Sequence, residues 1–217
     1  MKPGIIFDMD GTLWDSSEGV AISWTEIVNK EYDKDRVITA EDIQGVMGRT
    51  MDKIADALFS ELSKEERMAL LRKCCDYENE YLKEHGGILF EGLEDTFGKL
   101  QKNYDLFIVS NCQAGYIEAF LDHYGFWHYF KDIECYGNND LPKNENISKI
   151  VERNGLEKAV YVGDIQGDYD ATMAAGLPFI HAAYGFGTIE RRGGIYCFVR
   201  KKSLRVKSPI PIMRVLS

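Results

Sequence analysis

The strongest constraint on the fold lies in the first fourteen residues, where a short apolar run ends in two carboxylates. Residues 5–7 are β-branched and aromatic without alternating, which indicates a strand buried on both faces. Because side chains alternate along an extended chain, Asp8 and Asp10 leave this strand on the same side. Two carboxylates held that close favour a cation between them or a proton on one of them. In open α/β sheets, ligands bind at this carboxyl edge of the strands.

The run from Asp8 to Thr12 resembles the first motif, DxDGT, of the haloacid dehalogenase superfamily of phosphohydrolases. The resemblance implies that Asp8 is the nucleophile that becomes an aspartyl-phosphate. It also implies that Asp10 is the general acid/base, with a backbone carbonyl that touches Mg2+, and that Thr12 binds substrate. A carboxylate can attack phosphorus only if a cation offsets its repulsion from the phosphate, and a second acid must protonate the leaving alkoxide. Taken alone, the motif also fits a metal-binding turn or a helix cap.

From residue 92 onward the sequence alternates between helical and strand patterns. Strands separated by helices require right-handed crossovers, so the sequence predicts an α/β fold with a doubly wound, Rossmann-like parallel sheet. We expect strands at 106–109, 133–136, 159–162 and 179–183, and helices at 93–101, 116–123, 145–154 and 169–175.

The segment between the first strand and this alternating region has a helical pattern throughout. Thr39 with Asp42, and Ser63 with Glu66, have the spacing of helix N-caps. We therefore predict a core domain formed by residues 1–14 and 88–190, with a helical cap domain inserted at residues 15–87. Residues 191–217 form an atypical tail, in which basic residues cluster and two prolines break any helix.

Two further positions fall where the superfamily places its second and third motifs. Ser110 ends a predicted strand, and the resemblance implies that its hydroxyl and the neighbouring Asn111 bind the substrate phosphate. Lys143 resembles the lysine that neutralises the nucleophile and the transferring phosphoryl group, although Asn144 stands where the family most often has proline. Lys149 is the alternative, but it lies inside a predicted helix.

The fourth motif is more specific, because a GDxxxD pattern follows an apolar strand. Gly163 permits a tight exit from that strand. The resemblance implies that Asp164 ligates Mg2+ directly and that Asp168 supports the ligand shell through water or a hydrogen bond. Mg2+ prefers oxygen ligands from few carboxylates, waters and phosphate, which Asp8, Asp10, Asp164 and Asp168 would supply. Asp168 alone also fits a helix cap.

The resemblance is closest to the phosphoglycolate phosphatase-like branch with a helical cap. Residues 45–50 resemble the cap loop that faces the active site, and Arg49 fits a clamp for a substrate carboxylate or a second phosphate. A surface salt bridge explains Arg49 equally well.

The composition limits the partners and the compartment. A net charge of −9 argues against non-specific binding to nucleic acid or anionic membranes. Five cysteines without CxxC spacing indicate free thiols in a reducing cytoplasm, and no apolar stretch is long enough to span a bilayer. The oligomeric state is open.

Four motifs in the family's order predict a Mg2+-dependent phosphatase that hydrolyses a small soluble phosphate ester through an aspartyl-phosphate. Two alternatives remain. One is a phosphosugar mutase of the same superfamily, and the other is a binding protein on a catalytically retired version of the fold.

Overall fold

The computed structural model describes residues 2–190 and the backbone of residues 196–199. Its centre is a six-stranded sheet in the order β5-β4-β1-β6-β7-β8, with every neighbouring pair of strands parallel. The doubly wound parallel α/β fold predicted from the sequence is therefore confirmed. The strands are β1 (Gly4–Phe7), β4 (Asp105–Ser110), β5 (Phe130–Cys135), β6 (Ala159–Gly163), β7 (Phe179–Ala182) and β8 (Tyr196–Val199).

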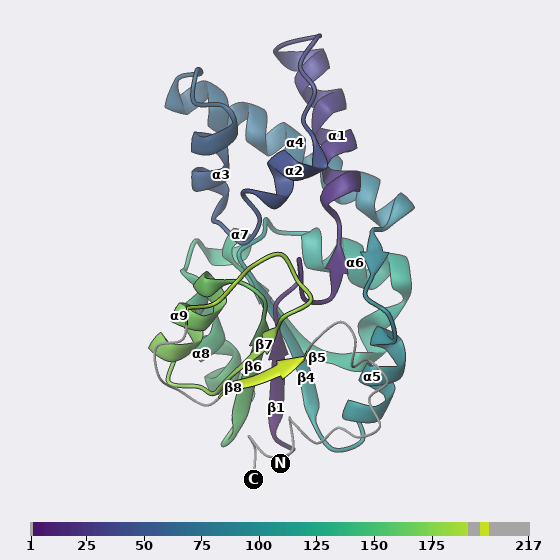
Figure 1. The fold of residues 1–217 in the computed structure, drawn as a ribbon, viewed down its shortest axis with the longest axis vertical. Helices are drawn as coiled ribbons and strands as arrows, with labels where there is room; N and C mark the ends of the chain where they lie inside the picture. Colours follow the sequence, from purple (N-terminus) through teal and green to yellow (C-terminus); the bar gives the residue numbers. More distant parts are fainter. Residues whose placement is uncertain (1, 191–195, 200–217) are drawn as a thin grey trace.

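The side chains of β1 alternate between two hydrophobic clusters, one on each face of the sheet. Ile5 and Phe7 belong to the larger cluster, together with residues of α5 and α6, whereas Ile6 packs with residues of α8 and α9. The sheet is thus covered by helices on both faces (Figure 1). The core helices are α5 (Leu93–Leu100), α6 (Tyr116–Tyr124), the 3-10 turn η1 (Phe126–Tyr129), α7 (Tyr136–Asn139), α8 (Lys143–Arg153) and α9 (Gln166–Ala174).

Four helices stand beyond the carboxyl edge of the sheet, at the top of Figure 1. They lie between β2 (Trp14–Asp15) and β3 (Ile88–Leu89), which pair as a short antiparallel ribbon that the sequence pattern did not indicate. The predicted helix starts at Thr39 and Ser63 are confirmed as capping boxes. We call residues 15–87 the cap, which includes α1 (Ser17–Glu31), α2 (Ala40–Gln44), α3 (Met51–Leu58) and α4 (Lys64–His85).

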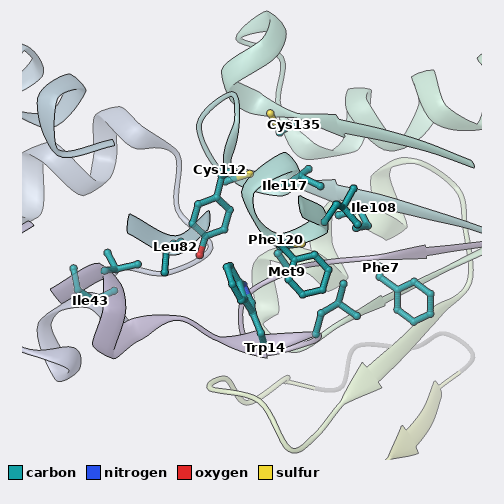
Figure 2. Close-up of a cluster of buried hydrophobic side chains, with 14 of the residues drawn as sticks. Phe7, Met9, Trp14, Ile43, Leu82, Ile108, Cys112, Ile117, Phe120 and Cys135 are labelled. Atoms are coloured by element: carbon teal, nitrogen blue, oxygen red, sulfur yellow. The ribbon is translucent and has the colours of Figure 1, made fainter. Parts of the chain in front are cut away.

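A continuous hydrophobic cluster joins the cap to the sheet. Trp14 is fully buried at the junction, and its ring meets Phe120 edge-on at 5.0 Å between centroids. Figure 2 shows these two rings between Phe7 on the sheet side and Leu82 on the cap side. Because one cluster spans the junction, the packing holds the cap over the carboxyl edge of the sheet.

Several boundaries differ from those predicted; the helix expected from residue 169, for example, begins at Gln166. The strand expected at 133–136 runs from Phe130 to Cys135, because its first residues are partly polar and give no apolar run. Helix α8 begins at Lys143 rather than at residue 145, since Pro142 is its N-cap residue. Strand β8 lies within the segment assigned to the basic tail and extends the sheet beside β7. Residues 191–195 and 200–217 lie outside the described part of the chain.

No helix in the described part of the chain is long and apolar enough to cross a membrane. The four described cysteines are free and buried, as expected for reduced thiols, whereas the side chain of Cys197 lies outside the described residues. They are Cys74, Cys75, Cys112 and Cys135.

Candidate active site

Three neighbouring strands deliver the candidate residues to one edge of the sheet. In the register of the sheet, Phe7 of β1 lies between Ile108 of β4 and Val162 of β6. Asp8 therefore follows the central strand, and its backbone N–H still donates to the carbonyl of Val162 at 2.9 Å. Ser110 is the last residue of β4, and Asp164 comes directly after β6. Parallel strands end at the same edge, which brings these side chains together.

Lys143 forms a buried ion-pair triad with two of the predicted aspartates. Its Nζ lies 2.7 Å from Asp8 Oδ1 and 2.6 Å from Asp168 Oδ1, and all three side chains are almost completely buried. Lys149, the alternative lysine, is exposed on the same helix. The first turn of α8 thus places one cation between two carboxylates that are 160 residues apart.

The loop after β6 is held by Asp168 and requires small residues. Asp168 Oδ2 accepts hydrogen bonds from the backbone N–H groups of Asp164 and Ile165, at 3.0 and 3.1 Å. A Cβ on Gly163 would lie 2.6 Å from the Asp168 side chain, and a Cβ on Gly11, whose φ is +78°, would lie 2.1 Å from Asp164 Oδ2. Glycine therefore allows the two loops to approach each other at the site.

The cluster of Asp8, Asp164 and Asp168 has the arrangement of a cation site. One carboxylate oxygen from each residue lies within 4.8 Å of the other two. Asp164 Oδ2 accepts a hydrogen bond from the backbone N–H of Phe186 at 2.7 Å, while its buried Oδ1 has no hydrogen-bond partner among the described residues. Carboxylate oxygens are the ligands that Mg2+ prefers, so these donors fit that ion.

Burial raises the pKa of two of these carboxyls. The pKa of Asp8 rises to about 7, first through burial and then through the nearby Asp168, although Lys143 opposes the shift. The pKa of Asp164 rises to about 8, again mainly through burial and then through Asp168 and Asp8. A divalent cation among the three carboxylates would offset the cost of burying their charges and the repulsion between them.

Asp10 faces a different set of partners. Its Oδ1 accepts hydrogen bonds from the hydroxyl groups of Ser16, at 2.8 Å, and Tyr116, at 2.6 Å. The Asp10 carboxylate is thus not part of the three-aspartate cluster that meets the cation-site geometry. Burial raises the pKa of Asp10, although the hydrogen bonds from Tyr116 and Ser16 oppose the shift.

A small pocket of about 50 Å³ lies between the cap and the strand ends. Its lining brings together Asp10, Ser110, Asn111 and Arg49. Asn111 Nδ2 donates to the carbonyl of Gly48 at 2.9 Å, which links the loop after β4 to the cap. Arg49 is exposed, and its guanidinium donates to the carbonyl of Gly45.

Thr12 is fully buried, and its hydroxyl has no partner among the described residues. Thr12 does not line the described pocket, whereas the other two predicted substrate-binding residues, Asn111 and Arg49, do.

Several aromatic and polar neighbours of the site were missed from the sequence. Tyr161 donates to the carbonyl of Val109 at 2.7 Å, and its hydroxyl oxygen lies 3.4 Å from Asp8 Oδ1. Tyr161 sits in an apolar strand, and Tyr116 begins a helix, so each has the pattern of an ordinary core residue. Only their proximity in space to Asp8 and Asp10 distinguishes them.

The geometry agrees with what comparisons with known proteins show. Residues 5–182 match the family model described as haloacid dehalogenase-like hydrolase. A phosphoglycolate phosphatase of Shigella boydii is 28% identical over 210 residues, which cover 84% of this chain and 82% of the relative. The phosphoglycolate phosphatase of Salmonella typhimurium is 27% identical over the same length.

Solved structures share the fold at lower identity. A haloacid dehalogenase-like hydrolase of Bacteroides fragilis superimposes with a TM-score of 0.79 at 21% identity, covering 94% of this chain and 100% of that one. A protein described as a predicted phosphoglycolate phosphatase, from Haemophilus somnus, gives 0.76 at 22% identity over 94% and 97% of the two chains. A β-phosphoglucomutase of Clostridium difficile gives 0.64 at 19% identity over 83% and 84%.

The family model covers most of the chain, and a solved haloacid dehalogenase-like hydrolase shares its fold. The chain belongs to the haloacid dehalogenase-like hydrolase family.

Proposed function

We propose that this protein is a Mg2+-dependent hydrolase of a small phosphate monoester and that it works through an aspartyl-phosphate on Asp8. The observation that carries the proposal is the buried contact of Asp8 with Lys143, near an Asp164 oxygen that has no hydrogen-bond partner in the part of the chain that the structure describes. The carboxyl edge of the sheet thus brings together Asp8 as the nucleophile, the ammonium of Lys143 as a fixed cation, and Asp164 as a ligand for Mg2+. These are the parts that phosphoryl transfer to a carboxylate requires.

The side chains divide the two chemical steps between them. In the first, an Asp8 oxygen forms a bond to phosphorus while the bond to the ester oxygen breaks, and Asp10 gives its proton to the departing alkoxide. In the second, Asp10 takes a proton from a water molecule, which attacks the aspartyl-phosphate and releases phosphate and free Asp8. Lys143 and Ser110 hold the phosphoryl oxygens throughout.

In this proposal, the side chains of Asp8 and Asp164 and the backbone carbonyl of Asp10 bind Mg2+ directly. Asp168 supports them indirectly, because both of its oxygens already accept hydrogen bonds from Lys143 or from backbone N–H groups. A bound Mg2+ would supply charge that neutralises the phosphate and aligns it with the nucleophile.

The stabilisation of the protein by Mg2+ is expected to increase with pH. The pKa values of Asp8 and Asp164 are raised in the folded, metal-free protein. Each group therefore contributes stability that is fully present below its unfolded pKa of about 4. That contribution is lost as the pH rises through the folded pKa values of about 7 and about 8. Mg2+ binds the deprotonated forms, so its affinity rises by up to about tenfold per pH unit for each proton displaced.

The measurement is the shift in melting temperature caused by one fixed Mg2+ concentration, at about pH 6 and about pH 8. We expect the larger shift at the higher pH, and an equal shift at both would contradict the proposed ligands. Asp164→Asn should remove most of the shift, whereas Asp170→Asn, on the exposed side of α9, should keep it.

Replacing Asp10 with Asn is expected to separate the two steps. p-Nitrophenolate leaves without being protonated, so this variant should still form the aspartyl-phosphate from p-nitrophenyl phosphate. Hydrolysis of the intermediate should then be slower by about 10² to 10⁴, since the base is missing. Rapid mixing should show a burst of about one p-nitrophenolate per enzyme. Steady turnover at the wild-type rate would rule Asp10 out as the acid/base.

The substrate belongs to this proposal too. The relatives named above are phosphoglycolate phosphatases, so phosphoglycolate is the first compound to test. Phosphate release from a panel of small esters, with Mg2+ and with a chelator, tests the activity. Conversion of a hexose phosphate to its isomer without phosphate release would indicate the mutase alternative. A folded protein without either activity would indicate a retired enzyme.

A further inference from the structure

A buried carboxyl group from the cap lies opposite the strand ends, and the mechanism above does not use it. Glu78 of α4 is only 3% exposed and lines the same pocket as Asp10 and Ser110. Its Oε2 accepts a hydrogen bond from the indole N–H of Trp24 at 2.5 Å, and a second one comes from the side chain of Gln113. The first partner belongs to the cap and the second to the loop after β4.

Among the described residues, Glu78 has no cationic partner of the kind that a buried carboxyl usually has. The groups that act on it are Trp24, Gln113 and the like-charged Asp10, and no lysine, arginine or histidine of the described chain is among them. The pocket does include one cation, Arg49, but its guanidinium is exposed and donates to a cap carbonyl. Glutamate is almost never fully buried unless it is paired, because burying an unpaired charge is costly. Consistent with this, burial raises the pKa of Glu78 to about 8.

The size and position of the pocket limit what can reach this group. A volume of about 50 Å³ accommodates only a few non-hydrogen atoms, given that one water needs roughly 10 to 15 Å³ on the same measure. Asp10 and Ser110 mark the side where the ester oxygen and the phosphate would lie. A leaving group whose ester oxygen lies beside Asp10 would extend into the pocket that Glu78 lines.

We propose that Glu78 is a specificity-determining residue that accepts a hydrogen bond from a hydroxyl or ammonium group on the leaving group of the substrate. Such a donor would add a hydrogen bond to those from Trp24 and Gln113, and an ammonium would also supply the opposite charge that no described residue provides. A leaving group that ends in a carboxylate would instead place two acidic groups together. The proposal rests on the proposed phosphatase activity and specifies its substrate class.

Three esters of nearly equal size and one acidic ester test this. Propyl phosphate ends in a methyl group, 2-hydroxyethyl phosphate in a hydroxyl and 2-aminoethyl phosphate in an ammonium, while phosphoglycolate ends in a carboxylate. For the wild type, we expect kcat/KM for at least one of the two donor esters to exceed that for propyl phosphate and for phosphoglycolate by about tenfold or more. The donor ester with the higher kcat/KM shows whether Glu78 selects a hydroxyl or an ammonium group.

Two substitutions remove the acceptor in different ways. Glu78→Leu removes it entirely and should reduce the preference for the donor esters over propyl phosphate to about one. Glu78→Gln keeps an amide oxygen that can accept the hydrogen bond from the Trp24 N–H. We therefore expect this variant to fold, so that a change in its preferences is not caused by unfolding. Glu78→Gln should lower the ratio of kcat/KM for 2-aminoethyl phosphate to that for propyl phosphate by about tenfold. The corresponding ratio for 2-hydroxyethyl phosphate should fall less. Glu80→Gln, exposed on the same helix, is the matched control and should keep the wild-type preferences.

The outcomes separate this proposal from the proposed function. Equal kcat/KM for the propyl and donor esters in the wild type, a preference for phosphoglycolate, or unchanged preferences in both Glu78 variants would overturn the role of Glu78 while leaving the phosphatase intact. If no ester is hydrolysed, the proposed function fails, and calorimetric titration with the same four esters still tests Glu78. Tighter binding of a donor ester that Glu78→Leu abolishes would support the role, and equal affinities would overturn it.

Discussion

Replacing Asp8 with Asn is expected to lower kcat by at least about a thousandfold while the protein remains folded. The amide has nearly the shape of the carboxylate but cannot attack phosphorus to form the acyl-phosphate. Lys143 keeps Asp168 as a partner at 2.6 Å, so the buried cation is not left unpaired. The substitution also removes one of three mutually repelling carboxyls, which limits the cost to the metal-free fold.

Phosphate release gives kcat, and circular dichroism with thermal unfolding verifies the fold. Asp105→Asn is the matched control, because Asp105 begins β4 at the opposite edge of the sheet and its ion-pair partner among the described residues is the exposed Lys131. That variant should lose less than about 1 kcal/mol of stability and keep its activity. A folded Asp8→Asn protein that retains more than a few per cent of wild-type kcat would reject Asp8 as the nucleophile.

Replacing Lys143 with Met is expected to damage both activity and stability. The triad is almost completely buried, so removing its cation leaves Asp8 and Asp168 without a counter-charge. Breaking a buried ion pair from one side typically costs about 3 to 5 kcal/mol, which is a large share of the stability of a domain. The variant should also lose at least about a hundredfold in kcat, since no fixed cation then offsets the phosphate charge.

The loss of stability should depend on pH in a defined direction. Lys143 lowers the pKa of Asp8, so without it that pKa rises further above the unfolded value. A raised carboxyl pKa contributes stability that is present at low pH and is lost as the pH rises through the folded pKa. The free energy of unfolding, measured with urea in the presence of a chelator, should therefore differ most from wild type near pH 8 and least near pH 5.

Lys149→Met is the control for the triad, because Lys149 is exposed on the same helix. It should leave the free energy of unfolding within about 0.5 kcal/mol and should not change kcat. If the two lysine variants behaved alike, the buried ion-pair triad would not be the source of the effect. A Lys143→Met protein with wild-type turnover would remove this lysine from the mechanism.

The sequence predicted the arrangement of the core because its signals are local. Short apolar runs, glycines at strand exits and capping residues such as Thr39 and Ser63 each act within a few residues of their own position. The order of strands and helices then left few topologies open. Boundaries were less reliable, as at α8, where Pro142 starts the helix two residues earlier than predicted. The short β2–β3 ribbon was missed because its two strands are more than seventy residues apart in the sequence.

The individual interactions of the site could not be obtained in the same way. Nothing in the sequence around Tyr116 indicates that its hydroxyl reaches Asp10, or that Glu78 would be buried without a cation beside it. Tyr116 and Asp10 are distant along the chain, so their contact is determined by how α6 packs within the core. The burial of Glu78 is determined by how α4 of the cap packs against the core.

The sequence by itself determined a doubly wound sheet, an inserted helical segment, and the aspartates and the serine that follow strand ends, because parallel strands end at one edge of a sheet. Lys143, in the first turn of α8, was identified by its resemblance to the family's third motif. The tertiary structure decided how the aspartates differ. Asp8 pairs with Lys143, one Asp164 oxygen has no hydrogen-bond partner within residues 2–190, and Asp10 accepts hydrogen bonds from two hydroxyl groups. The physical reason is that burial and neighbouring charges govern the chemistry of a carboxyl group, and both exist only once distant segments have packed together.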